Sequence, residues 1–351
     1  MSFPSISCKD HTILILPFTH SLLLSPETLI STILSTLPTS SKKSFTVVFT
    51  SPTSPQLYGS LLQTPVKHFD IFQSFLGRIY AALATAQLNA GRVLMDVEVH
   101  FDGENGPWAE KLFHGREVED YQILVIEGVI LPTQVKSIIN SIPQTVLPPI
   151  PVHDQKPDTT ADSTSPSPAV VALGGTFDHL HAAHKLLLHS SLFLSTRKLI
   201  VGLVSDSLLT SKSHHELVQP LAERKFAVER FLQRIGGGKV TGEGESEQEG
   251  VELDIGEIHD GLGPTRYDPD IHALVVSKET FSGGQLVNNT RKQNGLNELD
   301  IFVVNVISDK DQLGSQLESE LDEKKLKELK MGSTGIRNWI YQQSQLDSQS
   351  T

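Results

Sequence analysis

The sequence predicts an α/β protein in which a doubly wound parallel sheet is preceded by a smaller α/β domain. Its 351 residues are 38% apolar, which is enough for a full core and leaves room for two domains. Residues 148–168 are rich in proline, serine and threonine and lack any pattern that could pack. From residue 169 onward, strand-like apolar runs alternate with helical patterns, as in parallel strands joined by right-handed crossovers.

The break at 148–168 divides the chain into parts. We expect an N-terminal α/β domain of unassigned role, a linker, a doubly wound domain and a disordered tail, at residues 1–147, 148–168, 169–341 and 342–351. In the N-terminal domain, apolar runs predict four strands and a longer pattern predicts one helix, at residues 12–16, 45–50, 93–101, 122–128 and 69–88, respectively.

Strands and helices alternate along the second domain. Strands are expected at 169–175, 198–205, 272–277 and 300–307. The helix after the first strand has apolar residues near helical spacing at Leu180, Ala183, Leu187 and Leu188. A second helix has Pro220 in its first turn and is expected to face the sheet with Phe226, Val228, Phe231 and Leu232. A third helix passes through Leu286 to Arg291, and the polar residues 236–250 are expected to form a surface loop.

Charge and composition exclude several classes of protein. The chain carries 29 basic and 41 acidic residues, a formal net charge of −12, so no overall field attracts nucleic acid or an anionic membrane. No apolar run approaches the roughly 20 residues that a membrane helix needs. The single cysteine, Cys8, excludes an intrachain disulfide and a multi-cysteine zinc site. Because no signal peptide is recognisable, we expect a cytoplasmic protein, with the nucleus as the alternative compartment.

The segment GGTFDHLHAAHK, residues 174–185, carries the clearest chemical signal. Two glycines at the end of a buried strand let the backbone turn tightly, and Asp178 or His179 is expected to cap the helix that follows. Such a turn aims backbone N–H groups and a helix N-terminus at the carboxyl edge of a sheet, where α/β folds bind phosphates. His181 and His184 share a helix face and can donate to phosphate oxygens. The alternative is that the glycine turn and the histidines are structural.

This segment resembles the first signature of the nucleotidylyltransferase superfamily, GTFD followed by HxGH, in a Rossmann-like domain. Its flanks resemble phosphopantetheine adenylyltransferases of the eukaryotic and archaeal kind. Residues 208–224, LLTSKSHHELVQPLAER, are similar to the family's segment with a substrate-binding lysine. Residues 260–296 match the order and spacing of its D-x-x-GP, DP, VVS-x-ET, GG, N-x-x-R and GL elements, and residues 330–339, KMGSTGIRNW, resemble the second signature, ISSTxIR. The resemblance covers about residues 169–341.

The resemblance implies transfer of AMP from Mg·ATP to 4′-phosphopantetheine, which gives dephospho-coenzyme A and pyrophosphate in coenzyme A synthesis. His184 matches the second histidine of HxGH and is expected to stabilise the α-phosphate in the transition state, with His181 assisting. Lys212 is expected to hold the pantetheine phosphate and to share charge with it. Thr176 and the backbone of Phe177, at the turn opened by Gly175, are expected to meet the phosphates of the nucleotide, and Thr176 also the acceptor.

The remaining implied roles concern the nucleotide and its metal. Residues at the start of the last helix are expected to bind the β- and γ-phosphates, and a central block to bind ATP around its base, ribose and phosphates. The first set is Ser333, Thr334 and Arg337, and the second is Ser277, Glu279, Thr280 and Arg291. Mg²⁺ is expected to arrive with ATP, without a dedicated protein site. The expected partners are the two substrates and other enzymes of the coenzyme A pathway, with no nucleic acid and no membrane.

Two residues depart from the family pattern. Ala183 replaces the glycine of HxGH and Gly332 replaces the first serine of ISSTxIR, whereas His184, Lys212 and Arg337 are retained. Two other interpretations stay open. One is another nucleotidylyltransferase, such as a cytidylyltransferase or a dinucleotide-forming adenylyltransferase, and the other is a non-catalytic nucleotide-binding relative.

The N-terminal domain shows no phosphate turn and no clustered catalytic side chains. Asp96, Glu98, His100 and Asp102 alternate along one expected strand, a pattern that in principle suits a metal. We interpret it instead as a solvated strand face. The domain is therefore expected to serve stability or partner binding.

Overall fold

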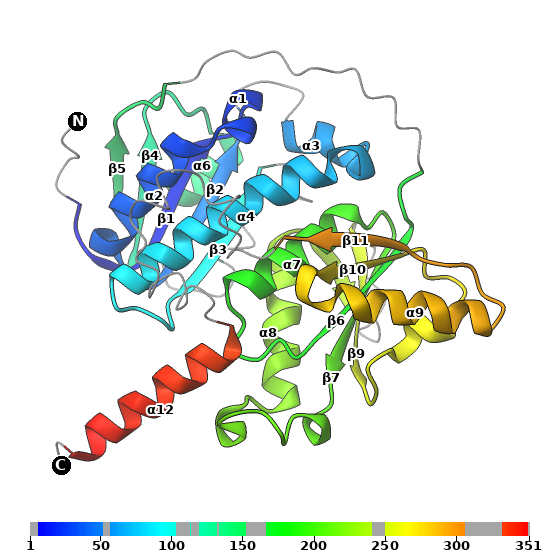
Figure 1. Ribbon diagram of the computed structural model, residues 1–351. Helices are drawn as coiled ribbons and strands as arrows, with labels where there is room; N and C mark the ends of the chain where they lie inside the picture. Colours follow the sequence, from blue (N-terminus) through cyan, green and yellow to red (C-terminus); the bar gives the residue numbers. More distant parts are fainter. Residues whose placement is uncertain are drawn as a thin grey trace. The chain divides into compact units, whose positions relative to one another are not determined.

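The chain forms two compact units, the first drawn mainly from residues before 167 and the second mainly from residues after 166. The structure is a computed structural model. It describes residues 6–51, 57–102, 113, 119–131, 133–151, 166–240, 250–305 and 332–349. The unit boundary lies at the end of the predicted linker, most of which, at 152–165, falls outside the described residues. Each unit contains one parallel sheet with flanking helices, so the predicted α/β fold class is confirmed (Figure 1).

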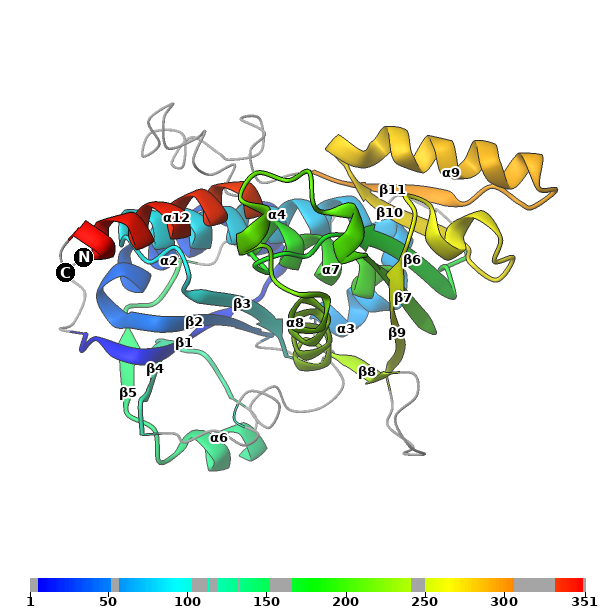
Figure 2. The same ribbon diagram turned by 90° about the horizontal axis from the view of Figure 1, so that it is seen from below.

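The first unit is built on a five-stranded sheet in the order β3-β2-β1-β4-β5. Its strands are β1 (Lys9–Pro17), β2 (Ser41–Thr50), β3 (Asp96–Phe101), β4 (Tyr121–Ile126) and β5 (Gln144–Leu147). Every pairing in it is parallel. The chain moves from the central β1 to one edge and then returns to the other, so right-handed crossovers place helices on both faces. Figure 2 shows α2 and α4 over one face and α6 across the other.

The helices of the first unit are α1 (His20–Leu24), α2 (Glu27–Ser40), α3 (Leu57–Leu62), α4 (Pro65–Asn89) and α6 (Thr133–Ile139). α4 contains the predicted helix and starts with Pro65, whose missing N–H is not needed in a first turn. α2 was not predicted from the sequence, and Pro38 lies inside it. Proline in the last turn removes only one late hydrogen bond, and tertiary packing of Leu29, Ile33 and Leu37 stabilises the helix.

The predicted solvated face of β3 is wrong. Glu98, His100 and Asp102 are all buried, and the Nε2 atom of His100 lies 3.1 Å from a carboxylate oxygen of Glu98. The physical reason is that parallel sheets are covered by helices on both faces, so a polar alternation does not imply contact with water. Among the described residues, no group of three or more histidine, cysteine, aspartate or glutamate side chains is placed to hold a metal ion.

The second unit has a six-stranded sheet in the order β11-β10-β6-β7-β9-β8, again with every pairing parallel. Its strands are β6 (Val170–Gly175), β7 (Lys198–Val204), β8 (Gly237–Val240), β9 (Val251–Ile258), β10 (Ala273–Ser277) and β11 (Asp300–Val304). Its α-helices are α7 (Ala182–Leu194), α8 (Leu221–Arg234), α9 (Phe281–Gln293) and α12 (Ser333–Gln349). The order reverses between β6 and β10, which is where doubly wound folds bind ligands.

Four short 3₁₀ turns connect these elements, at Asp206–Leu208, His215–Leu217, Gly263–Arg266 and Lys278–Thr280. Apolar side chains from β6, β10 and α9 form a core against one sheet face, including Ala172, Leu274, Val276 and Val287. The four strands predicted in this unit are confirmed, although residues 306–307 of the last lie outside the described part of the chain. None of the described helices is long and apolar enough to cross a membrane.

Three expectations for the second unit are wrong. Phe226 is 62% exposed, because α8 turns Val228, Phe231 and Leu232 inward and leaves Phe226 on its outer side. Residues 237–240, assigned to a loop, form the edge strand β8, which needs only main-chain pairing with β9. The tail expected to be disordered is helical as far as Gln349, since neither glycine nor proline interrupts the chain after Gly335.

Candidate functional site

The turn after β6 lies at the point where the strand order of the second sheet reverses. Gly175 ends the strand, and a Cβ atom there would lie 3.1 Å from the ring of Phe177, so the ring packs directly on the glycine backbone. Phe177 and His179 both have left-handed backbone angles, with φ of 51° and 44°. Such angles cost energy in residues other than glycine and are concentrated at functional sites. Among the described residues, the N–H groups of Thr176 and Phe177 have no hydrogen-bond partner.

The first turn of α7 is also open. The residue that precedes the helix is His181, and no side chain caps its N–H groups. The prediction that Asp178 or His179 caps this helix is therefore wrong. The Asp178 carboxylate is fully buried and accepts hydrogen bonds from the Gln219 N–H and from Arg337 instead. Free N–H groups at a helix start, next to those of the preceding turn, form a site for an anion.

His181 and His184 lie together at this helix start. Their rings stack with centroids 3.8 Å apart, and the ring of Phe177 lies 5.3 Å from that of His184. Both ring nitrogens of His181 and Nδ1 of His184 are buried without a partner in the described part of the chain. Unsatisfied buried polar atoms are costly, so these three nitrogens are available to a bound partner.

Both histidines are held in the neutral form. Burial lowers the pKa of His181 from 6.5 to about 3, and the charges of Lys185 and His179 act in the same direction. Burial also holds the pKa of His184 well below its ordinary value, with His181 and Lys212 contributing. At neutral pH each ring is therefore an uncharged hydrogen-bond donor and acceptor.

Lys212 lies in the connection between β7 and α8 and is exposed. Its charge contributes to the lowered pKa of His184, so the two predicted catalytic residues lie within electrostatic reach of each other. The loop is held by its neighbours. The carbonyl oxygen of Ser213 accepts a 2.9 Å hydrogen bond from Arg337 Nε, and His214, with φ of 51°, stacks on Tyr341 of α12 at 4.5 Å.

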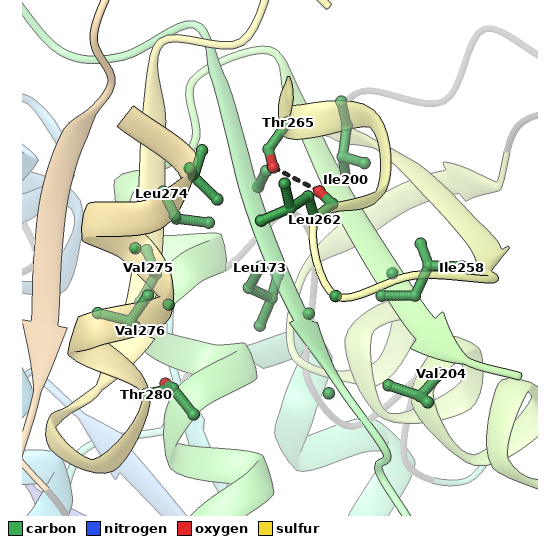
Figure 3. A pocket seen from close by; sticks show the side chains of 18 of the residues that line it. Leu173, Ile200, Val204, Ile258, Leu262, Thr265, Leu274, Val275, Val276 and Thr280 are labelled. Atoms are coloured by element: carbon green, nitrogen blue, oxygen red, sulfur yellow. Dashed lines mark hydrogen bonds between the residues drawn. The ribbon is translucent and has the colours of Figure 1, made fainter. Parts of the chain in front are cut away.

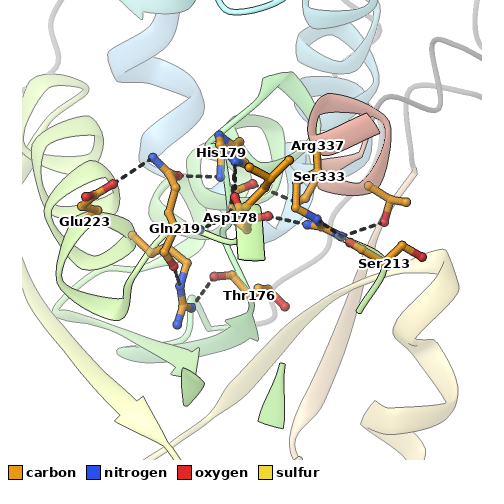
Figure 4. Close-up of polar contacts among 11 residues, drawn as sticks. Thr176, Asp178, His179, Ser213, Gln219, Glu223, Ser333 and Arg337 are labelled. Carbon is orange, nitrogen blue, oxygen red and sulfur yellow. Dashed lines mark hydrogen bonds and ion pairs between the residues drawn. The ribbon is translucent and has the colours of Figure 1, made fainter. Parts of the chain in front are cut away.

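The start of α12 closes this side of the site. Ser333 donates from Oγ to the carbonyl oxygen of Asp178 at 2.8 Å, and Arg337 forms an ion pair with the Asp178 carboxylate. Figure 4 shows these contacts joining Asp178, Ser213, Ser333 and Arg337. The buried Arg337 thus connects the two predicted signatures, and its guanidinium faces Asp178, Ser213 and the Thr334 hydroxyl. Its assignment to the β- and γ-phosphates, like those of Ser333 and Thr334, stays a prediction.

A second buried arginine, Arg224 on α8, lies behind the turn. Its guanidinium donates to the carbonyl oxygens of Thr176, Val204 and Gln219, at 2.7, 2.9 and 3.0 Å, and lies 2.6 Å from the carboxylate of Asp206. The side chain of Gln219 in turn accepts a 2.7 Å hydrogen bond from the His179 N–H. These contacts fix the turn from the side opposite to its free N–H groups.

A pocket of about 530 Å³ opens at the carboxyl edge, over β6, β7 and β10 (Figure 3). Of the predicted site residues, those that line it are Gly175, Thr176, Glu279 and Thr280. Its walls are otherwise mostly apolar and include Ile200, Ile258, Leu262, Leu274 and Val276. Gly202 makes room for Ile258, since a Cβ at this glycine would lie 2.9 Å from the Ile258 side chain.

The central block is placed partly in and partly behind the pocket. Ser277 and Thr280 bond to each other at the start of the 3₁₀ turn that carries Glu279. Arg291 is almost fully buried and donates to the carbonyl oxygens of Thr265, Asp268 and Asn297. In this structure it holds the Gly263–Arg266 turn beside the pocket, and its contact with the nucleotide stays a prediction.

Sequence reasoning missed Arg224, Gln219 and the pairing role of Asp178. One signal was present for Arg224. It shares the inner stripe of α8 with Val228 and Phe231, four and seven residues further on, and a charged residue in such a stripe needs buried partners. Asp178 and Arg337 are 159 residues apart in sequence, and no local pattern pairs them.

Comparison with known proteins identifies relatives of the second unit. Residues 172–339 match the cytidylyltransferase-like family. The chain is 37% identical over 145 residues to a phosphopantetheine adenylyltransferase of Saccharomyces cerevisiae, covering 41% of this chain and 44% of that protein. It is 34% identical over 186 residues to an uncharacterized protein of Schizosaccharomyces pombe, covering 53% and 52%. The matches thus span about half the length of these two relatives.

An archaeal relative is matched over most of its length. This is a phosphopantetheine adenylyltransferase of Pyrococcus furiosus, 33% identical over 151 residues, which are 43% of this chain and 84% of the archaeal protein.

Proposed function

This chain belongs to the phosphopantetheine adenylyltransferase family of cytidylyltransferase-like proteins, and we propose from that membership that it transfers AMP from Mg·ATP to 4′-phosphopantetheine. A phosphate oxygen of the acceptor forms a bond to the α-phosphorus of ATP, and the bond from the α-phosphorus to the bridging oxygen breaks. Dephospho-coenzyme A and pyrophosphate are the products. The observation that best supports this reaction is the open turn after β6, residues 176–179, which we call the phosphate turn and which lies beside two neutral histidines and a lysine.

The turn supplies donors for the nucleotide phosphates. The N–H groups of Thr176 and Phe177 and those of Ala182, Ala183 and His184 at the start of α7 are without partners among the described residues. They add no net charge and need no reorganisation when charge develops on the α-phosphate. In-line transfer requires positioning and electrostatic stabilisation more than a covalent nucleophile.

His184 and Lys212 are proposed to act on the reacting phosphates. A neutral His184 donates one hydrogen bond to the α-phosphate without needing to lose or gain a proton, and the stacked His181 keeps its ring in place. The Lys212 ammonium is a compact charge on a flexible stem, which suits an acceptor phosphate that moves during transfer.

The pocket supports an acceptor that joins a phosphate to a less polar arm. Apolar side chains, among them Ile200 and Val276, form most of its wall. Thr176 of the phosphate turn lines the same pocket, so a phosphate and an apolar arm can be bound side by side. Glu279 and Thr280 offer polar groups at the other side, where ribose hydroxyls can be bound. Mg²⁺ arrives as part of the substrate Mg·ATP, where it neutralises the phosphate oxygens.

The test is steady-state release of pyrophosphate by the purified full chain with Mg·ATP and 4′-phosphopantetheine, with dephospho-coenzyme A identified by mass. We expect turnover, and we expect a His184→Ala variant to lose about 100- to 1000-fold in kcat, the usual effect of removing a transition-state donor. CTP in place of ATP, and nicotinamide mononucleotide in place of phosphopantetheine, test the sibling reactions.

Three results would contradict the proposal. Turnover only with CTP or only with another acceptor would identify a different nucleotidylyltransferase. ATP binding without any turnover would identify a non-catalytic relative. Turnover that His184→Ala leaves unchanged would remove the proposed centre of the reaction.

A further inference from the structure

Arg224 is buried where its guanidinium contacts only other parts of the protein. Its side chain is fully buried, and its donors reach three carbonyl oxygens and one carboxylate. Three of these partners are the carboxyl end of β7 at Val204, the start of the α8 segment at Gln219, and the phosphate turn at Thr176. Burying a charged side chain costs free energy that its partners must offset, so the buried position of Arg224 calls for an explanation.

The bond to Thr176 fixes the direction of the following N–H group. A trans peptide unit is planar, so its C=O and its N–H point in opposite directions. The carbonyl oxygen of Thr176 is held 2.7 Å from Arg224, on the inner side of the turn. The N–H of Phe177, in the same peptide unit, therefore points outward, and it has no partner among the described residues.

The left-handed angle of Phe177 makes this restraint necessary. A φ of 51° is unfavourable for a residue with a side chain and persists only where surrounding contacts impose it. The flat guanidinium donates from all three of its nitrogens to different segments at once, which a lysine ammonium on a flexible stem does not reproduce. Asp206, which is 56% exposed on its side chain, balances the charge and also accepts from the Leu221 N–H.

We propose that Arg224 is a positioning residue: by holding the carbonyl oxygen of Thr176 it aims the N–H of Phe177 at the substrate phosphates. It does not touch substrate. The inference rests on the proposed function only for the identity of the anion, since any phosphate bound at this turn would meet the same N–H group.

The first test is kinetic and uses two matched variants of the full chain. Arg224→Lys keeps the positive charge and loses the planar guanidinium with its several donors. Arg230→Lys makes the same change at an exposed position of α8. We expect Arg224→Lys to lower kcat/KM for ATP about 100-fold, the effect of misplacing a group in the site by about 1 Å. Arg230→Lys is expected to match the unchanged protein. Asp206→Asn provides a milder perturbation, with a several-fold loss, if Arg224→Lys does not fold.

The second test observes the peptide unit directly. The dipeptide Thr–Phe occurs twice in the sequence, at 176–177 and 280–281. Labelling threonine with ¹³C at the carbonyl and phenylalanine with ¹⁵N therefore gives two selected amide signals, one for Phe177 and one for Phe281. We expect Arg224→Lys to move the Phe177 signal and leave that of Phe281 in place. Inorganic pyrophosphate is expected to shift Phe177 in the unchanged protein and to shift it less in the variant.

The outcomes separate this proposal from the proposed reaction. If the protein lacks adenylyl transfer but pyrophosphate shifts Phe177 only when Arg224 is present, the positioning role stands and the proposed function fails. If the protein turns over and Arg224→Lys changes neither kcat/KM nor the Phe177 signal, the positioning role is overturned. If neither pyrophosphate nor ATP shifts the Phe177 signal in the unchanged protein, the positioning role is overturned as well.

Discussion

The two units share a strand order and differ at the edge where a ligand would bind. Numbered along each unit, the five core strands follow the order 3-2-1-4-5, and β8 is an extra edge strand in the second unit. After the first strand, the first unit continues Phe18-Thr19-His20 and the second continues Phe177-Asp178-His179, following Thr176. The same topology therefore presents two similar turns in very different surroundings.

The turn of the first unit is closed by its own contacts. The N–H of Phe18 donates to the carbonyl oxygen of Thr50, and Thr19 caps α1 by accepting from the Leu22 N–H. The Phe18 ring packs against Phe49, Phe75 and Phe101, with centroids 5.0 to 5.8 Å apart. Strand-end positions that could receive a ligand are filled by aromatic rings.

The turn of the second unit keeps its donors available. Two glycines precede it, its backbone takes left-handed angles, and Arg224, Gln219 and Arg337 hold it from behind. Doubly wound topology thus provides a position for a phosphate, but the topology alone does not make a binding site. The site arises where buried polar groups keep main-chain N–H groups unpaired.

The largest expected difference between the two turns is in stability. Asp178→Asn weakens the buried ion pair with Arg337 and leaves its charge poorly compensated, so we expect a loss of about 3 to 5 kcal/mol in the free energy of unfolding. Thr19→Ala in the first unit removes only a cap, worth about 1 kcal/mol. Urea unfolding followed by circular dichroism measures both. Equal losses in the free energy of unfolding would show that the buried ion pair stabilises the protein no more than the helix cap does.

The second test closes the open edge. Gly175→Val places a branched side chain against the Phe177 ring, so the turn must shift, and we expect kcat to fall about 100-fold. Pro17→Val, at the end of the corresponding strand of the first unit, is expected to leave turnover unchanged. Pyrophosphate release measures the effect, with circular dichroism to verify folding. Full activity of Gly175→Val would show that the turn geometry is not required.

The third test is the pH dependence of stability. The unfolded chain binds a proton at His181 below about pH 6.5, whereas the folded chain does so only near pH 3. Stability is therefore complete above pH 6.5 and falls as the pH drops through this window. For His181 we expect a loss of up to about 2 kcal/mol between pH 7 and pH 5, because burial, together with the charges of Lys185 and His179, disfavours the protonated ring.

The matching variant is His181→Gln, which has no group that titrates in this range. Urea unfolding at both pH values should show a smaller loss for the variant than for the unchanged protein. An equal loss would mean that His181 is protonated in the folded state as readily as in the unfolded chain.

The smallest expected effect concerns the Lys212 loop. Tyr341→Ala removes the ring that stacks on His214, an interaction worth about 1 kcal/mol, so we expect KM for the acceptor to rise several-fold. KM for ATP is expected to stay the same, because the ring of Tyr341 stacks on His214 of the Lys212 loop. A change in KM for ATP alone would show that α12 supports the nucleotide rather than the Lys212 loop.

Local patterns in the sequence predict much of this fold and the centre of the site. Long apolar runs identify β1, β6 and β10, and the two glycines with the spaced histidines identify the phosphate turn. What the sequence does not reveal depends on distant contacts. The buried Glu98 and His100 look solvated until both sheet faces are covered, and Asp178 is a capping candidate until Arg337 is seen beside it.

The central claim is that nucleotide binds at the carboxyl edge of the second sheet and not at the matching edge of the first. Hydrogen–deuterium exchange of the full chain, with and without Mg·ATP, tests this most directly by mass spectrometry of peptides. We predict slower exchange at residues 174–184 when ATP is present and no change at residues 17–24. Protection at 17–24, or none at 174–184, would contradict the claim.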